Sequence, residues 1–152
     1  KEAWVKIKIN HITDTDMVTK LYQASKAGVK IDIVIRGNCS LVPGIKGLSE
    51  NIRCVGIIDR YLEHSRILIF ANGGKPRYFL GSADWMPRNL LNRIEVLTPV
   101  YDEELQADLM RTISYGMRDT TNGRFVDGKG TNNFVEGEPF RSQQELYKEY
   151  KK

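Results

Sequence analysis

The sequence has few of the residues and runs that assign a chain to a specialised class. It has only two cysteines, Cys39 and Cys54, so no disulfide framework is expected and a reducing cytoplasm fits best. It has only two histidines, so the possible role of each can be considered individually. The longest apolar runs, after Arg53 and at 67–71, are far shorter than the roughly 18 residues that cross a bilayer. We therefore expect a cytoplasmic chain without a transmembrane segment. Peripheral association with the inner membrane is compatible with this expectation.

The composition is that of one ordinary globular domain. Of the 152 residues, 41% are hydrophobic and 28% are charged, which is enough to form a core. The net charge of +4 is unevenly distributed, since residues 1–101 carry 15 basic and 9 acidic side chains, and an anionic ligand is expected there. The excess is too small to predict nucleic-acid binding. The sequence starts without a methionine or a leader, which predicts a piece of a longer chain.

The first part of the chain predicts a β-α-β unit. Apolar and polar residues alternate through Val5, Lys6, Ile7, Lys8, Ile9 and Asn10, as in a strand with one solvent-exposed face. A helix follows, with Thr13 or Asp14 as its cap and Gly28 at its end. A second strand at 29–35 would pair with the first in parallel. Arg36 then lies at the carboxyl end of that strand, where open α/β sheets bind ligands.

The rest of the chain predicts more strands, one helix and a polar tail. Strands are expected at 52–58, 66–70, 78–82 and 94–100, and a helix at 102–115. The predicted catalytic domain spans 1–117. Residues 118–152 are predicted to be an exposed loop and a short C-terminal helix of the same domain, in which Ser142 and Glu145 have capping-box spacing.

His64 is the stronger of the two histidine candidates. Arg60 and Glu63 precede it, Arg66 follows it, and a predicted strand begins there. A neutral imidazole can move a proton near pH 7, and arginine forks match phosphate oxygens, so this group suits phosphoryl transfer. The alternative is a core histidine among solvated arginines. No metal-ligand spacing surrounds His11, which is expected to be structural or to lie on the surface.

Several other residues favour structural roles. Gly73 and Gly74 predict a hairpin turn, because no helix is expected to start there and cradle a phosphate. Tyr61 and Trp85 are more typical of a core or its rim than of a base-stacking site. Cys39 lacks a histidine nearby in sequence, so a partly buried thiol is expected. No complete metal site is predicted.

Two runs of sequence resemble a known family. RYLEHSRILIFANGG, followed by YFLGSADWMPRNL, is similar to half of the phospholipase D superfamily signature. Together with GVKIDIVIRG, GLSENIRCVGIIDRYLEHSRI and RIEVLTPV, these runs resemble the last domain of the polyphosphate kinases, in unbroken order from about Val5 to Leu109. The resemblance implies an α/β fold, a phospholipase-D-like mixed sheet of five to seven strands flanked by helices.

The resemblance also implies a function and its partners. The whole enzyme would transfer the terminal phosphate of ATP reversibly to inorganic polyphosphate, through a phosphohistidine on a preceding domain absent here. Two phospholipase-D-like domains of one chain would form the site, and the full enzyme would be a homo-oligomer. Mg²⁺ would accompany ATP or ADP, with its ligands mainly outside this chain. The chain alone is expected to be inactive.

The resemblance assigns roles residue by residue. Arg36 and His64 would bind nucleotide phosphates, and His64 would also serve in catalysis as an acid or base. Further phosphate contacts are expected from Arg60, Arg66, Ser82 and Arg88. The sequence departs from the superfamily signature at Arg66, which replaces a lysine, and at Asp84, which replaces an asparagine; the signature's later aspartate is missing, and Asn72 begins a turn at that point. These losses favour phosphoryl transfer to or from a nucleoside diphosphate over hydrolysis.

Two alternative functions remain open from sequence alone. One is a phosphodiesterase, a nuclease or phospholipase of the same superfamily, that works as a dimer and pairs two copies of His64. The other is a non-catalytic module that binds polyanions, in which binding would depend on salt and survive loss of His64.

Overall fold

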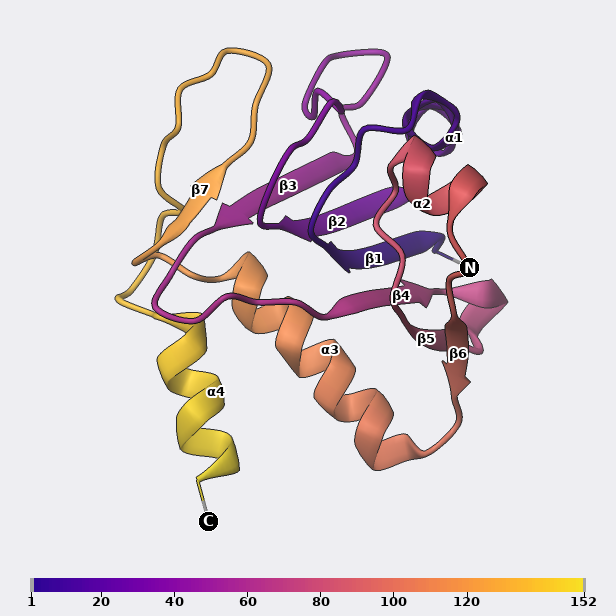
Figure 1. Cartoon of the computed structure of the whole chain (residues 1–152). Coiled ribbons are helices and arrows are strands. Elements are labelled where there is room, and N and C mark those ends of the chain that lie inside the picture. Colours follow the sequence, from indigo (N-terminus) through magenta and orange to yellow (C-terminus); the bar gives the residue numbers. More distant parts are fainter. Residues whose placement is uncertain (1, 152) are drawn as a thin grey trace.

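The computed structural model describes residues 2–151 and contains one seven-stranded sheet with helices on both faces (Figure 1). The strands lie in the order β6-β5-β4-β1-β2-β3-β7. Parallel and antiparallel pairs occur in the same sheet. The predicted mixed sheet flanked by helices is therefore confirmed.

The predicted β-α-β unit lies at the centre of this sheet. β1 (Trp4–Ile9) pairs in parallel with β2 (Lys30–Ile35), and α1 (Thr15–Lys26) connects them. Asp14, one of the two predicted caps, accepts a hydrogen bond at 3.0 Å from a backbone N–H of the first turn. Gly28 follows the helix with φ of +86°, a left-handed conformation that glycine adopts without strain.

The other predicted strands extend the sheet on both sides. Their bounds are Ile52–Ile57 for β3, Arg66–Phe70 for β4, Arg77–Gly81 for β5 and Leu97–Val100 for β6. β3 pairs in parallel with β2, while β4, β5 and β6 form successive antiparallel pairs beyond β1. Gly73 and Gly74 lie in the tight turn between β4 and β5, as predicted.

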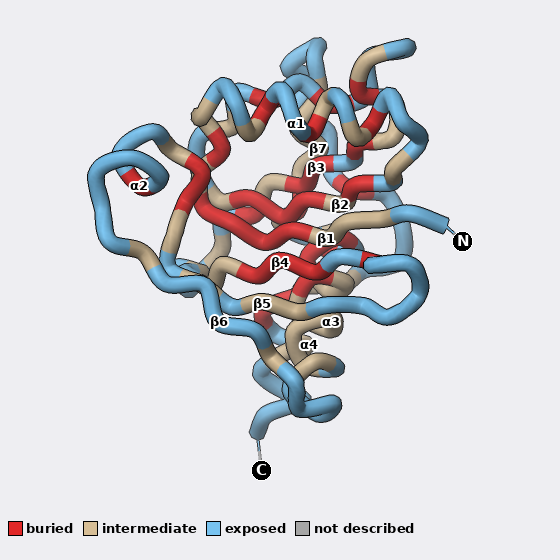
Figure 2. Tube along the Cα trace, turned by 90° about the vertical axis from the view of Figure 1, so that its right-hand side faces the viewer, coloured by how far each residue is buried: buried red, intermediate tan, exposed pale blue. Residues whose placement is uncertain are grey.

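Two apolar clusters pack on opposite faces of the sheet. α1 covers one face, where Val18 and Leu21 join isoleucines of β1 and β2. α3 (Glu103–Met117) covers the other face through Ile113 and Met117. Figure 2 shows the buried residues concentrated in the central strands, while β6 at the edge is largely exposed. The core of the domain is therefore the sheet centre, from β4 to β3.

Because both faces are covered, one prediction for β1 is wrong. Lys8 and Asn10 were expected on a solvent-exposed face, but their exposed fractions are only 4% and 1%. Lys8 offsets the cost of burial by pairing with Glu63, whose Oε2 lies 2.7 Å from Lys8 Nζ. Alternation identified the strand correctly, but it carries no information on what covers the second face.

The segment after Met117 packs against the sheet more closely than predicted. Instead of a single exposed loop, it contains β7 (Gly123–Phe125), which pairs antiparallel with β3. Asp119 and Val135 are buried, whereas residues 128–134 are exposed, as the sequence predicted. The segment therefore contributes both to the core and to the surface near β3.

Two helices complete the described chain. α4 (Ser142–Tyr150) forms as predicted, but the expected capping box does not, because Ser142 is buried and its hydroxyl donates to Asp119. α2 (Pro87–Asn92) was not predicted; a proline in its first turn suits a helix start. Within residues 2–151, no helix has the length and apolar character needed to span a bilayer.

Candidate functional site

The strand register gathers polar residues at one end of the strands. We call this end the carboxyl edge, because β1, β2, β3 and β5 finish there. The last residues of β1 and β2 are paired, so Asn10 and Arg36 leave the sheet side by side. Arg66, the first residue of β4, pairs with the last residue of β5 and therefore lies at the same edge. The carboxyl ends of strands are the usual ligand site of open α/β sheets.

Asp84 is the centre of a hydrogen-bonded network at this edge. It is buried and accepts hydrogen bonds from the backbone N–H groups of Asn10 at 3.0 Å and His11 at 3.3 Å. Arg66 completes the contacts, with Nε 3.3 Å from Oδ1 and Nη2 3.1 Å from Oδ2. Burial opposes ionisation of this carboxyl, but the hydrogen bonds from Arg66 and the backbone outweigh it and lower the pKa of Asp84. Asp84 is therefore an ionised anchor for this edge.

Arg66 connects this anchor to His64. Its Nη1 donates to Nδ1 of His64 at 2.8 Å and to the carbonyl oxygen of His64 at 2.9 Å. Because a guanidinium has only donors, Nδ1 must accept, and the proton of the neutral imidazole is on Nε2. His64 itself is exposed. The network thus presents an oriented imidazole N–H to solvent.

Arg36 joins the same network through Asn10. Its Nε donates to Oδ1 of Asn10 at 3.1 Å, which fixes the guanidinium at the edge. In the described chain, residues 2–151, the terminal nitrogens of Arg36 have no hydrogen-bond or ion-pair partner. Arg36 also lines a cavity of about 460 Å³ beyond the ends of β2 and β3. The network therefore brings Arg36, Arg66 and His64 together, as the sequence analysis expected. The terminal nitrogens of Arg36 and the Nε2–H of His64 are the donors that remain available.

The other three predicted residues lie apart from this network. The Ser82 hydroxyl donates to Glu95 and accepts from the backbone N–H of Val96 at 3.1 Å. Arg88 is exposed on α2. Arg60 lines a separate cavity of about 390 Å³ beside α4, with its guanidinium 5.5 Å from the ring centre of Tyr61.

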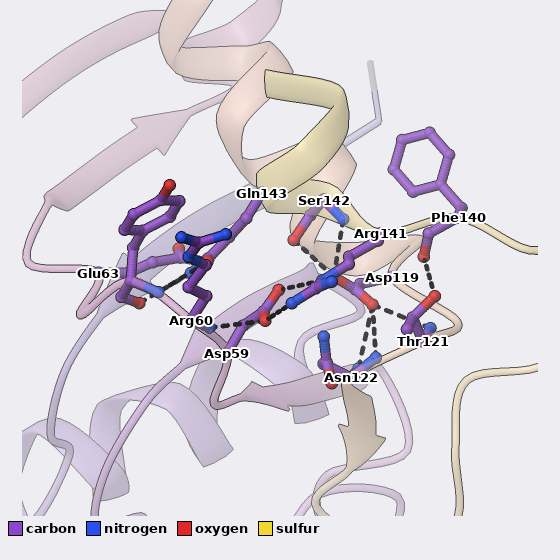
Figure 3. A network of polar contacts seen from close by, with 12 residues as sticks. Asp59, Arg60, Glu63, Asp119, Thr121, Asn122, Phe140, Arg141, Ser142 and Gln143 are labelled. Atoms are coloured by element: carbon purple, nitrogen blue, oxygen red, sulfur yellow. Dashed lines mark hydrogen bonds and ion pairs between the residues drawn. The ribbon is translucent and has the colours of Figure 1, made fainter. Parts of the chain in front are cut away.

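Sequence reasoning missed the residues that hold the loop carrying His64. In Figure 3 the loop between β3 and β4 lies against the start of α4. Gln143 accepts from the backbone N–H of Tyr61 at 2.9 Å and donates to the Tyr61 carbonyl at 2.8 Å and to Glu63 at 3.0 Å. Glu63 also binds Lys8 in the sheet. The loop is thereby fixed from both sides, one residue before His64.

A second contact fixes the beginning of this loop. Arg141 Nε lies 2.9 Å from Oδ2 of Asp59, and Nη2 lies 2.5 Å from Oδ1 (Figure 3). The hydrogen bonds from Arg141 lower the pKa of Asp59, although partial burial opposes them. Such a bidentate pair orients both groups more strongly than a single contact.

Asp119 is a buried carboxylate that holds the start of α4 in place. Its side chain is fully buried and accepts from the backbone N–H groups of Thr121 at 3.0 Å, Asn122 at 2.7 Å and Gly123 at 3.3 Å. It also accepts from the backbone N–H of Ser142 at 2.8 Å and from its hydroxyl at 2.6 Å. One carboxylate therefore joins the turn before β7 to the start of α4 (Figure 3).

Local sequence patterns gave little indication of these supports. Asp59 and Arg141 are 82 positions apart in the sequence, and so are Tyr61 and Gln143. Asp119 lies in a polar stretch rich in threonine, asparagine and glycine, where an aspartate is usually exposed. The one available signal was the cluster of turn-forming residues after Asp119, because an aspartate often accepts hydrogen bonds from backbone N–H groups two and three residues later.

The remaining candidates have structural surroundings. Trp85 is buried in the core cluster that α1 covers, as expected for a core aromatic. Cys39 is half-buried and Cys54 is buried, and both are free thiols. A hydrogen bond from Cys54 lowers the pKa of Cys39, although burial opposes this shift. Among residues 2–151, no three histidine, cysteine, aspartate or glutamate side chains are grouped to hold a metal ion.

Comparison with known proteins identifies the family. A family model described as polyphosphate kinase C-terminal domain 2 matches residues 1–145. Polyphosphate kinase from Vibrio vulnificus strain YJ016 is 47% identical over 150 residues, which are 97% of this chain and 21% of that protein. The crystal structure of polyphosphate kinase from Porphyromonas gingivalis matches with a TM-score of 0.94 and 41% identity, covering 99% of this chain and 24% of that one.

A more distant structure shows the wider fold. The phospholipase D family member Nuc from Salmonella typhimurium matches with a TM-score of 0.62 over 84% of each chain, at 15% identity. At that identity the likeness concerns the fold alone. The chain spans about a fifth of the length of the curated relatives that it matches. It belongs to the polyphosphate kinase C-terminal domain 2 family and has the phospholipase-D-like α/β fold that its sequence predicted.

Proposed function

We propose that this chain is the part of an ATP:polyphosphate phosphotransferase that holds phosphate groups at the carboxyl edge. The reaction is the reversible transfer of the terminal phosphate of ATP to inorganic polyphosphate, through a phosphohistidine on a preceding domain. The observation that carries the proposal is the network of Arg36, Arg66 and His64 in a domain whose relatives are polyphosphate kinases. Phosphoryl transfer depends mainly on positioning and charge neutralisation, which these groups can supply.

Arg36 and His64 are the proposed direct contacts to the nucleotide phosphates. The free terminal nitrogens of Arg36 can donate in parallel to two phosphate oxygens, and its charge is independent of pH in the working range. The Nε2–H of His64 can donate to an oxygen of the same phosphate group. When the bond to the terminal phosphate breaks, this N–H can stabilise the negative charge that develops on the leaving nucleoside diphosphate. His64 acts as an acid only after a second proton makes it an imidazolium; it then gives the Nε2 proton to the leaving group and takes it back in the reverse direction.

Arg66 is proposed to act through His64. Four hydrogen bonds to Asp84 and His64 occupy most of its donors, so its main contribution is to hold the imidazole in one tautomer. Gln143 and Lys8 fix the same loop through Glu63. Arg60, Ser82 and Arg88 are proposed as outer contacts that guide the polyanion towards the edge.

The remaining requirements of the reaction lie outside these residues. Mg²⁺ is proposed to enter with the nucleotide, and its ligands are proposed to lie mainly outside this chain, since residues 2–151 contain no group of three histidine, cysteine, aspartate or glutamate side chains that could hold it. The chain is about a fifth of its relatives' length, and the phosphohistidine is proposed to lie in a preceding domain. Contacts between copies of the full enzyme belong to the same proposal.

The test compares Arg36→Ala and His64→Ala in the full-length enzyme that contains this domain. Losing one charge-assisted contact costs about 1.5–3 kcal/mol, so the Km for ADP should rise roughly ten- to a hundredfold in Arg36→Ala. His64→Ala should lower kcat as well. Arg77→Ala is a matched control, because Arg77 is exposed at the opposite end of β5.

Unchanged kinetics in both variants, with unchanged folding, would refute the assignment of this site. Release of nitrophenol from a phosphodiester substrate would instead support the phosphodiesterase alternative. Salt-dependent binding of polyphosphate that survives both substitutions, without turnover, would support a non-catalytic binding module.

A further inference from the structure

The cavity beside Arg36 has a second arginine in its wall. The cavity of about 460 Å³ lies between the ends of β2 and β3 and the segment that forms β7. Arg36 and Gly37 line it from the β2 side, and Asn122, Arg124 and Phe134 line it from the β7 side. No sequence motif pointed to Arg124, which lies in the stretch predicted to be an exposed loop.

Arg124 is held in place without a carboxylate. Its guanidinium lies 3.7 Å from the ring centre of Phe134, and Nη1 donates to the carbonyl oxygen of Asn132 at 2.7 Å. Stacking on an aromatic ring and one carbonyl contact fix the side chain but leave its charge uncompensated. In this respect Arg124 resembles Arg36, which is fixed by the amide oxygen of Asn10.

These two arginines differ from the arginines that serve structural roles. Arg66, Arg111 and Arg141 each form an ion pair with an aspartate. Over residues 2–151, Arg36 and Arg124 form no ion pair, and no acidic side chain lines their cavity. Two fixed and uncompensated positive charges that line the same cavity produce a positive potential in it, which attracts a ligand with several negative charges.

The shape and polarity of the cavity narrow the choice of ligand. Its polar lining includes the donors Thr121, Asn122 and Asn132, and its volume is within the range of small-molecule sites. A linear anion with one charge on each of several successive groups can contact Arg36 and Arg124 together. A chain of phosphate groups joined by anhydride bonds has this arrangement, because every phosphate carries a negative charge.

We propose that Arg36 and Arg124 together bind a phosphoanhydride chain across this cavity, with Phe134 positioning Arg124. The chain is a segment of polyphosphate or the phosphate tail of the nucleotide, which have the same chemistry at this site. The inference rests on the proposed function for the substrate class, and it adds a binding residue and a place for the ligand. Arg36 then links the cavity to the His64 network.

The experiment uses the full-length enzyme with Arg124→Gln, assayed in the direction that forms ATP from ADP and polyphosphate. We expect the Km for one of the two substrates to rise roughly ten- to a hundredfold, while kcat changes much less. A rise in the Km for polyphosphate identifies the bound segment as polyphosphate. A rise in the Km for ADP identifies it as the nucleotide tail.

Three further variants make the result specific. Arg124→Lys retains the charge but not the planar fork, so its Km should rise less than that of Arg124→Gln. Phe134→Leu removes the stacked ring and should produce an intermediate rise. Arg118→Gln is the matched control, because Arg118 also stacks on a phenylalanine, 4.6 Å from the ring centre of Phe140, but does not line this cavity.

Folding of each variant is compared by its thermal unfolding midpoint. Km values for both substrates that stay within twofold of wild type in folded Arg124→Gln would overturn the inference. If Arg124→Gln does not fold, unchanged Km values in Arg124→Lys and Phe134→Leu overturn it equally. Arg36→Ala separates the two proposals: if it alone raises the Km for ADP, the proposed function stands and only the role of Arg124 falls.

Discussion

The carboxyl edge has two halves that use arginine in different ways. Around Asp84, Arg66 is paired with a buried carboxylate and with His64, so its charge and its donors are satisfied within the protein. Around the 460 Å³ cavity, Arg36 and Arg124 are fixed by an amide, a carbonyl and an aromatic ring, and their charges are left uncompensated. In the first half the arginine orients other residues, whereas in the second half the arginines keep charges that are available to an anion.

An arginine near a candidate site therefore has two possible functions. A charge paired with a buried carboxylate contributes to orientation, because removing either partner leaves the other buried and unpaired. A charge without such a partner can be removed at little cost to the fold but at a large cost to anion binding. Loss of stability and loss of binding should therefore be separable at this edge.

The largest effect is expected from Asp84→Ala. It leaves Arg66 and two backbone N–H groups without an acceptor in a buried place. Breaking a buried ion pair from one side costs about 3–5 kcal/mol, and the free energy of unfolding should fall by that amount. Urea unfolding measures it, with Arg124→Gln as the comparison. Equal losses in the two variants would show that both halves of the edge are structural.

A smaller loss is expected from Asp119→Asn, because Asp119 is a buried carboxylate that accepts several hydrogen bonds but forms no ion pair within residues 2–151. The amide cannot accept all the hydrogen bonds that Asp119 receives from the turn before β7 and from Ser142. A buried donor without its acceptor costs about 1–3 kcal/mol. Asp127→Asn is the matched control, since Asp127 accepts from Lys129 and Thr131 in an exposed loop. Equal urea midpoints for the two variants would contradict the support role of Asp119.

Gly37→Ala probes the boundary between the two halves. A Cβ at this position would lie 2.3 Å from Cε1 of His11 and 2.9 Å from the Asn10 carbonyl oxygen, so the end of β1 must shift. Such crowding costs about 1–3 kcal/mol and should also displace Arg36. Gly56→Ala is the control for stability alone, because its Cβ would meet Val126 at an ordinary 3.6 Å but Gly56 lines the cavity. Equal thermal unfolding midpoints in the two variants, with a wild-type Km for ADP in Gly37→Ala, would show that this boundary tolerates displacement.

The smallest effect concerns pH. The pKa of Asp84 is lower in the folded chain than its ordinary value of 3.8, so the folded state favours the ionised form. Its contribution to stability is complete above that ordinary value and is lost as the pH falls through the lowered pKa. The difference in urea midpoint between wild type and Asp84→Asn should therefore shrink between pH 6 and pH 3. A constant difference would mean that ionisation of Asp84 contributes nothing.

Much of the fold was predictable because its signals are local. The alternation in β1, the cap at Asp14 and the glycine at 28 describe the chain within a few residues, and the structure confirms each of them. The buried Lys8 was not predictable, since α3, which packs on β1, lies more than 90 positions later in the sequence and its ion-pair partner Glu63 lies 55 positions later. The helix at 87–92 was missed because six residues carry too little periodicity.

The residues of the candidate site also differ in whether the sequence indicated them. Arg36 and His64 were singled out because Arg36 directly follows a strand and His64 lies two residues before one, and open α/β sheets commonly bind ligands at the carboxyl ends of their strands. Arg124 was not singled out because the polar composition of its surroundings is typical of a mobile loop. Its place in the cavity wall depends on the pairing of β7 with β3.

By itself, the sequence determined the β-α-β unit, the positions of most strands along the chain and the resemblance to the polyphosphate kinases. Only the tertiary structure decided which arginine is paired with a buried carboxylate and which keeps an uncompensated charge. Side-chain type and spacing set what a residue can donate or accept. Whether those donors are already used depends on contacts that only the folded chain makes, such as Asp84 with Arg66 and the Asn132 carbonyl with Arg124.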